Sequence, residues 1–213
     1  MDEFGKWHNE ILGNKVVKAL EKNGFHAIYF ETKEQAENFI MYHVKSGDDV
    51  GFGGSQTIKA LDLKKRIREI GGNILDHGEF GLNKEQKLQV MRAELVSDLF
   101  LCSSNAITLK GELVNVDGAG NRVAAMTFGP RKVIVVAGVN KIVEDIEEGF
   151  RRIRNNASPK NNKRLSLKNP CTINGNCIDC KSETRICRAY SVLKRKPMQS
   201  DISVVIIGEE LGF

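Results

Sequence analysis

The 213-residue sequence has little of what marks membrane and secreted proteins. None of its apolar runs reaches the roughly 18 residues that a transmembrane helix requires. The first residues, 1–7, are polar and acidic and lack the apolar core of a secretory signal, so we expect no membrane span and a cytoplasmic location. What is present is ordinary: 41% hydrophobic and 28% charged residues, which is typical of a globular chain that can bury a sizeable core.

Positive charge is concentrated in one segment. The formal net charge is +5, but residues 151–200 carry 13 Lys and Arg against two acids, Asp179 and Glu183. Such a stretch attracts phosphate, nucleic acid or an acidic partner, or it is a solvated surface that offsets negative charge nearby. Nucleic acid is the weaker of these alternatives, because no recognised nucleic-acid module accompanies the charge.

Strands and helices alternate through the first hundred residues. Apolar patterns predict strands at 26–30, 49–52, 73–76 and 99–103, and helices over 3–23, 32–46 and 56–70, with another after Asn83. This alternation is the signature of βαβ units and a mostly parallel sheet.

The pattern changes after residue 103. Residues 106–109 and 112–116 flank Lys110–Gly111, which predicts a β-hairpin. Apolar runs at 132–137 and 202–207 predict two more strands, the first central in the sheet and the second returning to it, because it is too apolar for a free tail. A helix is expected over 140–154, and the polar stretch 155–170, with Pro159 and Pro170, is typical of a linker.

The predicted fold class is therefore α/β, a Rossmann-like, mostly parallel sheet flanked by helices, with an inserted β-hairpin. Residues 1–158 and 201–213 form the α/β domain in this interpretation. Residues 159–200 form a basic, cysteine-rich excursion from it that carries a metal or iron–sulfur site.

A glycine-rich turn at 51–57 joins a predicted strand to a predicted helix. Gly53 and Gly54 let the backbone approach a phosphate or carboxylate, and Ser55 and Thr57 add hydroxyl donors. No Gly-Lys-Ser/Thr follows and the spacing is not GxGxxG, so this is neither a Walker motif nor a dinucleotide fingerprint. A tight turn with Ser55 as the helix N-cap is an equal alternative.

Polar residues also occupy two later turns. These residues are Asn105, Asp117, Asn121 and Arg122. In one interpretation they bind a polar ligand, with Arg122 as the partner of an anion. In the other they bond only to their own backbone. Clefts in open α/β sheets form beyond the carboxyl ends of strands. These residues are therefore predicted to share one pocket for an anionic small molecule with Gly53, Gly54 and Ser55.

Four cysteines form a compact set with the spacing C-x5-C-x2-C-x6-C: Cys171, Cys177, Cys180 and Cys187. The fifth, Cys102, lies in a predicted strand and is expected in the core. In a cytosolic chain such a set indicates a metal site more than disulfides. Zinc favours paired CxxC knuckles, and only Cys177 and Cys180 form one, so a [4Fe–4S] cluster is favoured over zinc. Four free thiols are the remaining alternative.

No catalytic residue can be named from the sequence. The four histidines show no metal-ligand spacing, and no Ser/His/Asp set or paired-carboxylate motif is visible. His77, after a predicted strand, is the one placed where sites often form.

Five segments together resemble the lactate-utilisation (LUD) domain family: Gly51–Ser55, Ser104–Thr108, Gly118–Ala124, Phe128–Pro130 and Gly138–Lys141. The resemblance implies a fold similar to ribose-phosphate isomerases and CoA transferases. It also implies a link to the oxidation of L-lactate, in which companion subunits carry iron–sulfur clusters, so iron–sulfur redox partner proteins are expected. The cysteine-rich segment departs from the C-type subunit of the three-protein lactate system, which leaves membership of that complex open.

Two classes of function follow. In the first, the protein is a redox or electron-transfer component of lactate or hydroxy-acid utilisation with a four-cysteine [4Fe–4S] site. In the second, it is a binding or regulatory module for an anionic nucleotide, CoA-like or sugar-phosphate ligand, with a structural zinc site. An isomerase or transferase activity rests on fold analogy alone.

Overall fold

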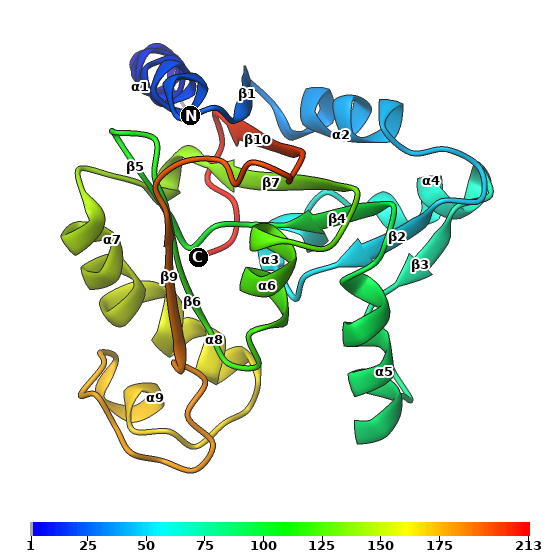
Figure 1. Cartoon of the computed structure of the whole chain (residues 1–213). Helices are drawn as coiled ribbons and strands as arrows, with labels where there is room; N and C mark the ends of the chain where they lie inside the picture. Colours follow the sequence, from blue (N-terminus) through cyan, green and yellow to red (C-terminus); the bar gives the residue numbers. More distant parts are fainter. Residues whose placement is uncertain (1) are drawn as a thin grey trace.

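A six-stranded parallel sheet forms the centre of the computed structural model, which describes residues 2–213 (Figure 1). From edge to edge its strands are β1 (His26–Phe30), β10 (Ile202–Ile207), β7 (Lys132–Gly138), β4 (Leu99–Cys102), β2 (Asp49–Phe52) and β3 (Asn73–Leu75). Every neighbouring pair is parallel. The predicted return of residues 202–207 to the sheet is confirmed, since β10 lies between β1 and β7.

The central strands are apolar throughout because both of their faces are buried. Along β7, Val133 and Val135 belong to one hydrophobic cluster, whereas Ile134 and Val136 belong to another. Helices α1 (Glu3–Lys22) and α6 (Asn121–Thr127) pack into the first cluster, and α2 (Lys33–Tyr42), α3 (Gln56–Lys59) and α4 (Leu63–Glu69) pack into the second. The sheet is thus covered by helices on both faces, as the α/β prediction requires.

Side-chain caps fix where several helices begin. Thr32 and Gln35 form a reciprocal capping box at α2. Asn83 and Gln86 form another at α5 (Lys84–Glu94). The single helix predicted over 56–70 is wrong, because the chain breaks between α3 and α4 at Asp62, whose left-handed backbone (φ 45°) interrupts the helical hydrogen-bond ladder.

A smaller sheet lies beside the first, in the order β8 (Ile142–Val143), β5 (Ala106–Thr108), β6 (Leu113–Asp117) and β9 (Ala189–Leu193). The antiparallel β5–β6 pair confirms the predicted hairpin. Strand β9 pairs with β6 over five residues. The cysteine-bearing chain therefore returns to the body of the domain before β10, and its description as an excursion is not confirmed.

The linker predicted over 155–170 is wrong in its first half. Helix α7 (Ile146–Arg152), a π-helical turn η2 (Ile153–Ala157) and α8 (Ser158–Arg164) run on without a break. Pro159 lies in the first turn of α8, directly after the π-helical turn. The helix expected from residue 140 begins only at Ile146, since a 3-10 turn η1 (Val139–Lys141) and β8 come first.

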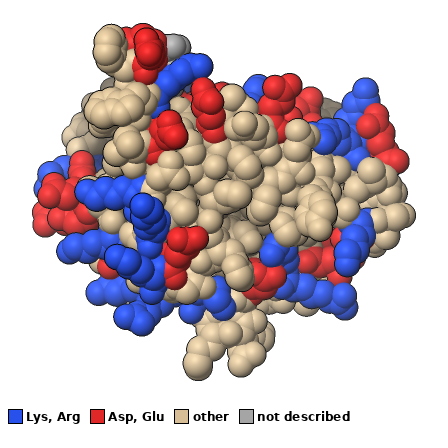
Figure 2. All heavy atoms as spheres, turned by 90° about the horizontal axis from the view of Figure 1, so that it is seen from above, with Lys and Arg blue, Asp and Glu red and all other residues tan. Residues whose placement is uncertain are grey.

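Helices α7, α8 and α9 (Cys171–Asn174) gather around β6 and β9, away from α4 and β3 (Figure 1). None of the helices formed by residues 2–213 combines the length and apolar character needed to cross a bilayer. The face shown in Figure 2 carries basic and acidic side chains interspersed around its rim and a broad uncharged area at its middle.

Candidate functional site

A cleft of about 330 Å³ opens where the loops after β2 and β4 meet the end of β6 and helix α8. It brings together most of the residues predicted to share a pocket: Gly54, Ser55, Asn105, Asp117, Asn121 and Arg122. Gly53 and Thr57 lie just behind this lining. A side chain at Gly53 would come within 3.6 Å of Arg122, and Thr57 bonds to the cleft residue Lys141. The expected proximity is therefore observed, whereas ligand binding by these residues stays a prediction.

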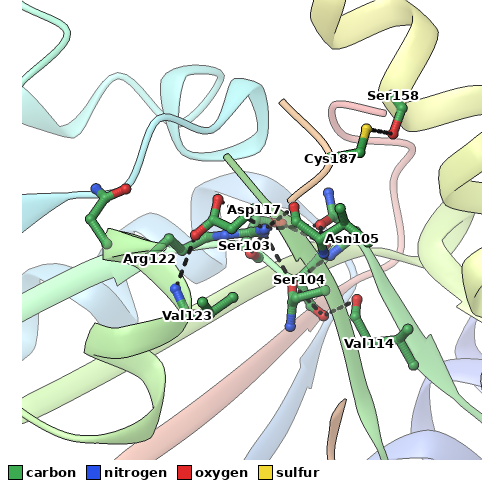
Figure 3. A network of polar contacts seen from close by, with 12 residues as sticks. Ser103, Ser104, Asn105, Val114, Asp117, Arg122, Val123, Ser158 and Cys187 are labelled. Atoms are coloured by element: carbon green, nitrogen blue, oxygen red, sulfur yellow. Dashed lines mark hydrogen bonds and ion pairs between the residues drawn. The ribbon is translucent and has the colours of Figure 1, made fainter. Parts of the chain in front are cut away.

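The side chain of Arg122 ties the loops of the cleft together (Figure 3). Nη1 donates to Ser103 O and to Asn115 Oδ1, both at 3.0 Å. Nη2 donates to Asn105 Oδ1 at 2.9 Å and to Val116 O at 2.8 Å, and it lies 3.5 Å from the Asp117 carboxylate. Both terminal nitrogens are therefore engaged by the protein itself, so Arg122 contributes charge to the cleft and holds its shape.

Lys141 is a cleft residue to which the sequence assigned no role. It is 3% exposed, at the end of η1 directly after β7. Its Nζ donates to Thr57 Oγ1 at 2.7 Å and to Ser103 Oγ at 2.9 Å, and no carboxylate of residues 2–213 pairs with it. Burial, followed by the nearby Arg152 and Arg122, lowers its pKa from the ordinary 10.5 to about 7.

Two further arginines add positive charge, Arg152 beside Lys141 and Arg164 in the lining of the cleft. Arg152 donates Nη1 to Asn105 O at 2.7 Å, but its Nη2 is buried without a hydrogen-bond partner. Arg164 lines the cleft, donates Nε to Asn161, and forms no ion pair within the described chain. Burial lowers the pKa of both guanidinium groups. Asp117 is the only acidic residue lining the cleft in the described chain, so basic side chains predominate in the lining.

His77, which lines the cleft, pairs with a buried glutamate behind the lining. His77 Nδ1 lies 2.7 Å from Oε1 of Glu94, whose side chain is 1% exposed. Asn121 donates to the other oxygen of Glu94 at 3.3 Å. Burial acts to lower the pKa of His77, but the hydrogen bond and charge of Glu94 outweigh it, so the pKa is raised overall. Sequence analysis placed His77 correctly after β3 but missed Glu94, which lies at the end of α5 and gave no local signal.

The four clustered cysteines line a second, small cavity of about 10 Å³: Cys171, Cys177, Cys180 and Cys187. Arg185 closes the loop around it by donating to the carbonyl oxygens of Cys180 and Cys187, both at 2.7 Å. Burial and then the neighbouring thiols raise the pKa of Cys171. Four thiols on one cavity fit zinc or an iron–sulfur cluster chemically. In the part of the chain that the structure describes, however, no three metal-binding side chains stand close enough together to hold a metal ion.

The cleft and the cysteine cavity share one wall. Ser158, Ile186 and Cys187 line both spaces. The Cys187 thiol donates to Ser158 Oγ at 3.3 Å (Figure 3). A group bound by the cysteines would therefore adjoin a ligand in the cleft. Cys102, as expected, is fully buried in the core, where burial raises its pKa to about 12.

Comparison with known proteins bears on this site. The sequence model of the LUD domain matches residues 13–207, which include the glycine-rich turn, Lys141 and all four clustered cysteines. The chain belongs to the LUD domain family. This confirms the resemblance found in the sequence, and the matched range runs through the segment interpreted as an excursion.

One solved structure agrees with this fold. A DUF162 family protein from Deinococcus radiodurans is 12% identical, with a TM-score of 0.53, and the match covers 93% of this chain and 98% of that one. At this identity the likeness shows the fold alone. The eIF2B beta subunit from Chaetomium thermophilum is 19% identical, with a TM-score of 0.37 over 53% of this chain and 40% of that one, too low to support any conclusion. No curated protein matches the sequence.

Proposed function

We propose that this LUD-domain protein binds a small carboxylic acid in its cleft and serves as a redox component of L-lactate or related hydroxy-acid utilisation. In this proposal Cys171, Cys177, Cys180 and Cys187 hold a [4Fe–4S] cluster. The observation that carries it is the wall shared by the two cavities, with Cys187 on both. A redox centre and its substrate need such adjacency for electrons to pass between them.

The charge of the cleft favours an anionic ligand. Lys141, Arg122 and Arg164 line it, and Asp117 is engaged with Arg122. Arg164 forms no ion pair within the described chain, so its guanidinium group is available to pair with an anion. The volume of about 330 Å³ is at the lower end for metabolite sites, which suits a compact acid better than a whole dinucleotide.

The cysteine segment supplies the ligands for a cluster. A bound [4Fe–4S] cluster contributes one-electron chemistry. Arg185, which bonds to the backbone of Cys180 and Cys187, holds the loop in place and puts positive charge beside the thiolates. Iron–sulfur redox proteins are the partners that such a component would exchange electrons with.

The test is anaerobic purification of the full chain with iron and sulfide analysis. We expect brown protein whose colour bleaches on reduction with dithionite. Cys187→Ser and Cys177→Ser should lose iron, whereas Cys102→Ala, which removes a core thiol outside the cavity, should keep it. Iron-free wild-type protein from anaerobic cells would refute the cluster.

A binding or regulatory module with a structural zinc site is the second candidate. The observation that favours it is the size of the cysteine cavity, about 10 Å³, which suits a single ion better than a cubane. Colourless protein with one zinc per chain, and with the metal lost in Cys187→Ser, would support this candidate and remove the electron-transfer role.

A further inference from the structure

We infer that Lys141 is a carbonyl-reactive residue, whose amine forms an imine with the keto group of a 2-oxo acid bound in the cleft. The inference rests on the proposed function, because it takes the ligand to be a small carboxylic acid. It follows from the hydrogen bonds around the amine, the charges beside it and its position in the lining of the cleft.

Both hydrogen-bond partners of the amine act as acceptors. The Thr57 hydroxyl donates its one proton to Leu211 O at 3.1 Å. The single proton of the Ser103 hydroxyl has two acceptors within reach, Ser104 O at 3.2 Å and Thr57 Oγ1 at 3.5 Å. The two oxygens are thus left to accept from Lys141 Nζ, at 2.7 and 2.9 Å. Two N–H groups of the amine are used in this way.

This arrangement matches the neutral amine. A neutral amine has two N–H groups and a lone pair, so both donors are satisfied and the lone pair stays free. An ammonium group would carry a third N–H, for which residues 2–213 offer no further acceptor, so that N–H would have to be satisfied by solvent in the cleft. The lone pair of a lysine in the lining of a cleft is the nucleophile that imine formation requires.

The surrounding charges also favour the neutral form of the Lys141 amine. Arg152 and Arg122 are near enough to Lys141 to disfavour its charged form, and burial disfavours it further. With a pKa of about 7, a large share of the amine is neutral at physiological pH. Arg164, which lines the same cleft and forms no ion pair in the described chain, is the residue suited to the carboxylate of the acid.

The step needs no oxidant or reductant. The nitrogen lone pair forms a bond to the keto carbon, and the carbonyl oxygen becomes a hydroxyl group. That oxygen then leaves as water together with the two hydrogens of the amine, and a carbon–nitrogen double bond remains. The 2-oxo acid is the oxidised partner of a 2-hydroxy acid, so this chemistry would retain the product of the proposed redox reaction.

The experiment is reductive trapping. The full chain is incubated with pyruvate and sodium cyanoborohydride, which converts an imine to a stable secondary amine, and the modified peptides are mapped by mass spectrometry. We expect the mass of pyruvate less one oxygen atom on Lys141, with labelling that rises as the pH increases through about 7. Lys141→Arg should lose this label, and Lys59→Arg, at an exposed lysine of α3, should keep it.

The peptide map of the labelled wild-type protein tests the inference even if Lys141→Arg fails to fold. Label spread evenly over surface lysines overturns the inference. Methyl pyruvate, which has the same keto group without the charge, separates the inference from the proposed function. Equal labelling of Lys141 by both probes supports the imine but contradicts an acid-selective cleft. Calorimetric binding of pyruvate without label on Lys141 supports the ligand class and overturns the imine.

Discussion

Replacing Lys141 with methionine should change how the stability of the protein depends on pH. In the folded chain the pKa of Lys141 is about 7, whereas in the unfolded chain it returns to about 10.5. Between these values the unfolded state binds more protons, so wild-type stability rises with pH. A single proton contributes about 1.4 kcal/mol for each pH unit, or about 3 kcal/mol between pH 7.5 and 9.5. Lys141→Met has no such contribution.

The assay is urea denaturation followed by circular dichroism at pH 7.5, 8.5 and 9.5 for both proteins. The quantity of interest is the difference in free energy of unfolding, wild type minus variant, because other titrating groups cancel in it. We expect this difference to increase by about 1.4 kcal/mol per pH unit. Lys59→Met, at an exposed lysine outside any ion pair in the described chain, is the matched control. A difference that does not vary with pH would refute the neutral buried amine.

Three further substitutions test the cleft and the fold. Arg122→Ala should lower the free energy of unfolding by about 3–5 kcal/mol in urea titrations. The side chain is only 13% exposed, and its removal leaves buried acceptors without a donor. A loss below about 1 kcal/mol would contradict the role of Arg122 in holding the loops together. Gly111→Ala places a methyl group 2.5 Å from the backbone of α1, whereas Gly175→Ala, at the same φ of 76°, meets nothing within 4 Å. Gly111→Ala should therefore lower the free energy of unfolding by about 1–3 kcal/mol more than Gly175→Ala does. Equal losses would show that α1 shifts to make room for the methyl group. Glu94→Gln should lower the pKa of His77 in an NMR titration, since Glu94 holds that pKa up against burial; an unchanged pKa would remove Glu94 as the cause.

The sheet could be predicted because strands that are buried on both faces have apolar residues at successive positions. Strands β7 and β10 are apolar at successive positions, and that pattern alone placed residues 202–207 back in the sheet. Strand β9 is not buried on both faces, so it could not be predicted in this way. Its residues are exposed or only partly buried, and it exists because it pairs with β6 over a long sequence separation. Pairing of that kind depends on register and not on composition.

Helix α8 was missed for a different reason, whereas α7 lies within the range predicted to be helical. Prolines and asparagines favour turns locally, and residues 155–170 contain two prolines and five asparagines. Helix α8 nevertheless forms because Asn162 and Ser158 are buried against the cysteine-bearing segment, where Asn169 donates to Asn162 Oδ1 at 2.6 Å. Tertiary contacts thus override the local preference, and this override positions Ser158 on the wall between the two cavities.

Sequence reasoning located the cleft but not the roles of its residues. Loops at the carboxyl ends of parallel strands meet by topology, so the proximity of Ser55 and Asn105 could be expected. The allocation of hydrogen bonds depends on distances that only the folded chain sets. Arg122, expected to meet the ligand, is engaged by four protein acceptors. Lys141, given no role, has only two hydroxyl partners and no counter-charge in the described chain.

These allocations give the three basic residues of the cleft different environments. Arg122 fixes the loops, Arg164 forms no ion pair within the described chain, and burial together with the nearby Arg152 and Arg122 lowers the pKa of Lys141 to about 7. A site meant only to hold a phosphate would gain more from a charged, solvated lysine than from one whose charge is suppressed by burial. The suppression is useful where the amine must react. The proposed imine would thus account for the suppressed charge of this lysine, and the shared wall at Cys187 would keep the bound acid beside the cysteine cavity.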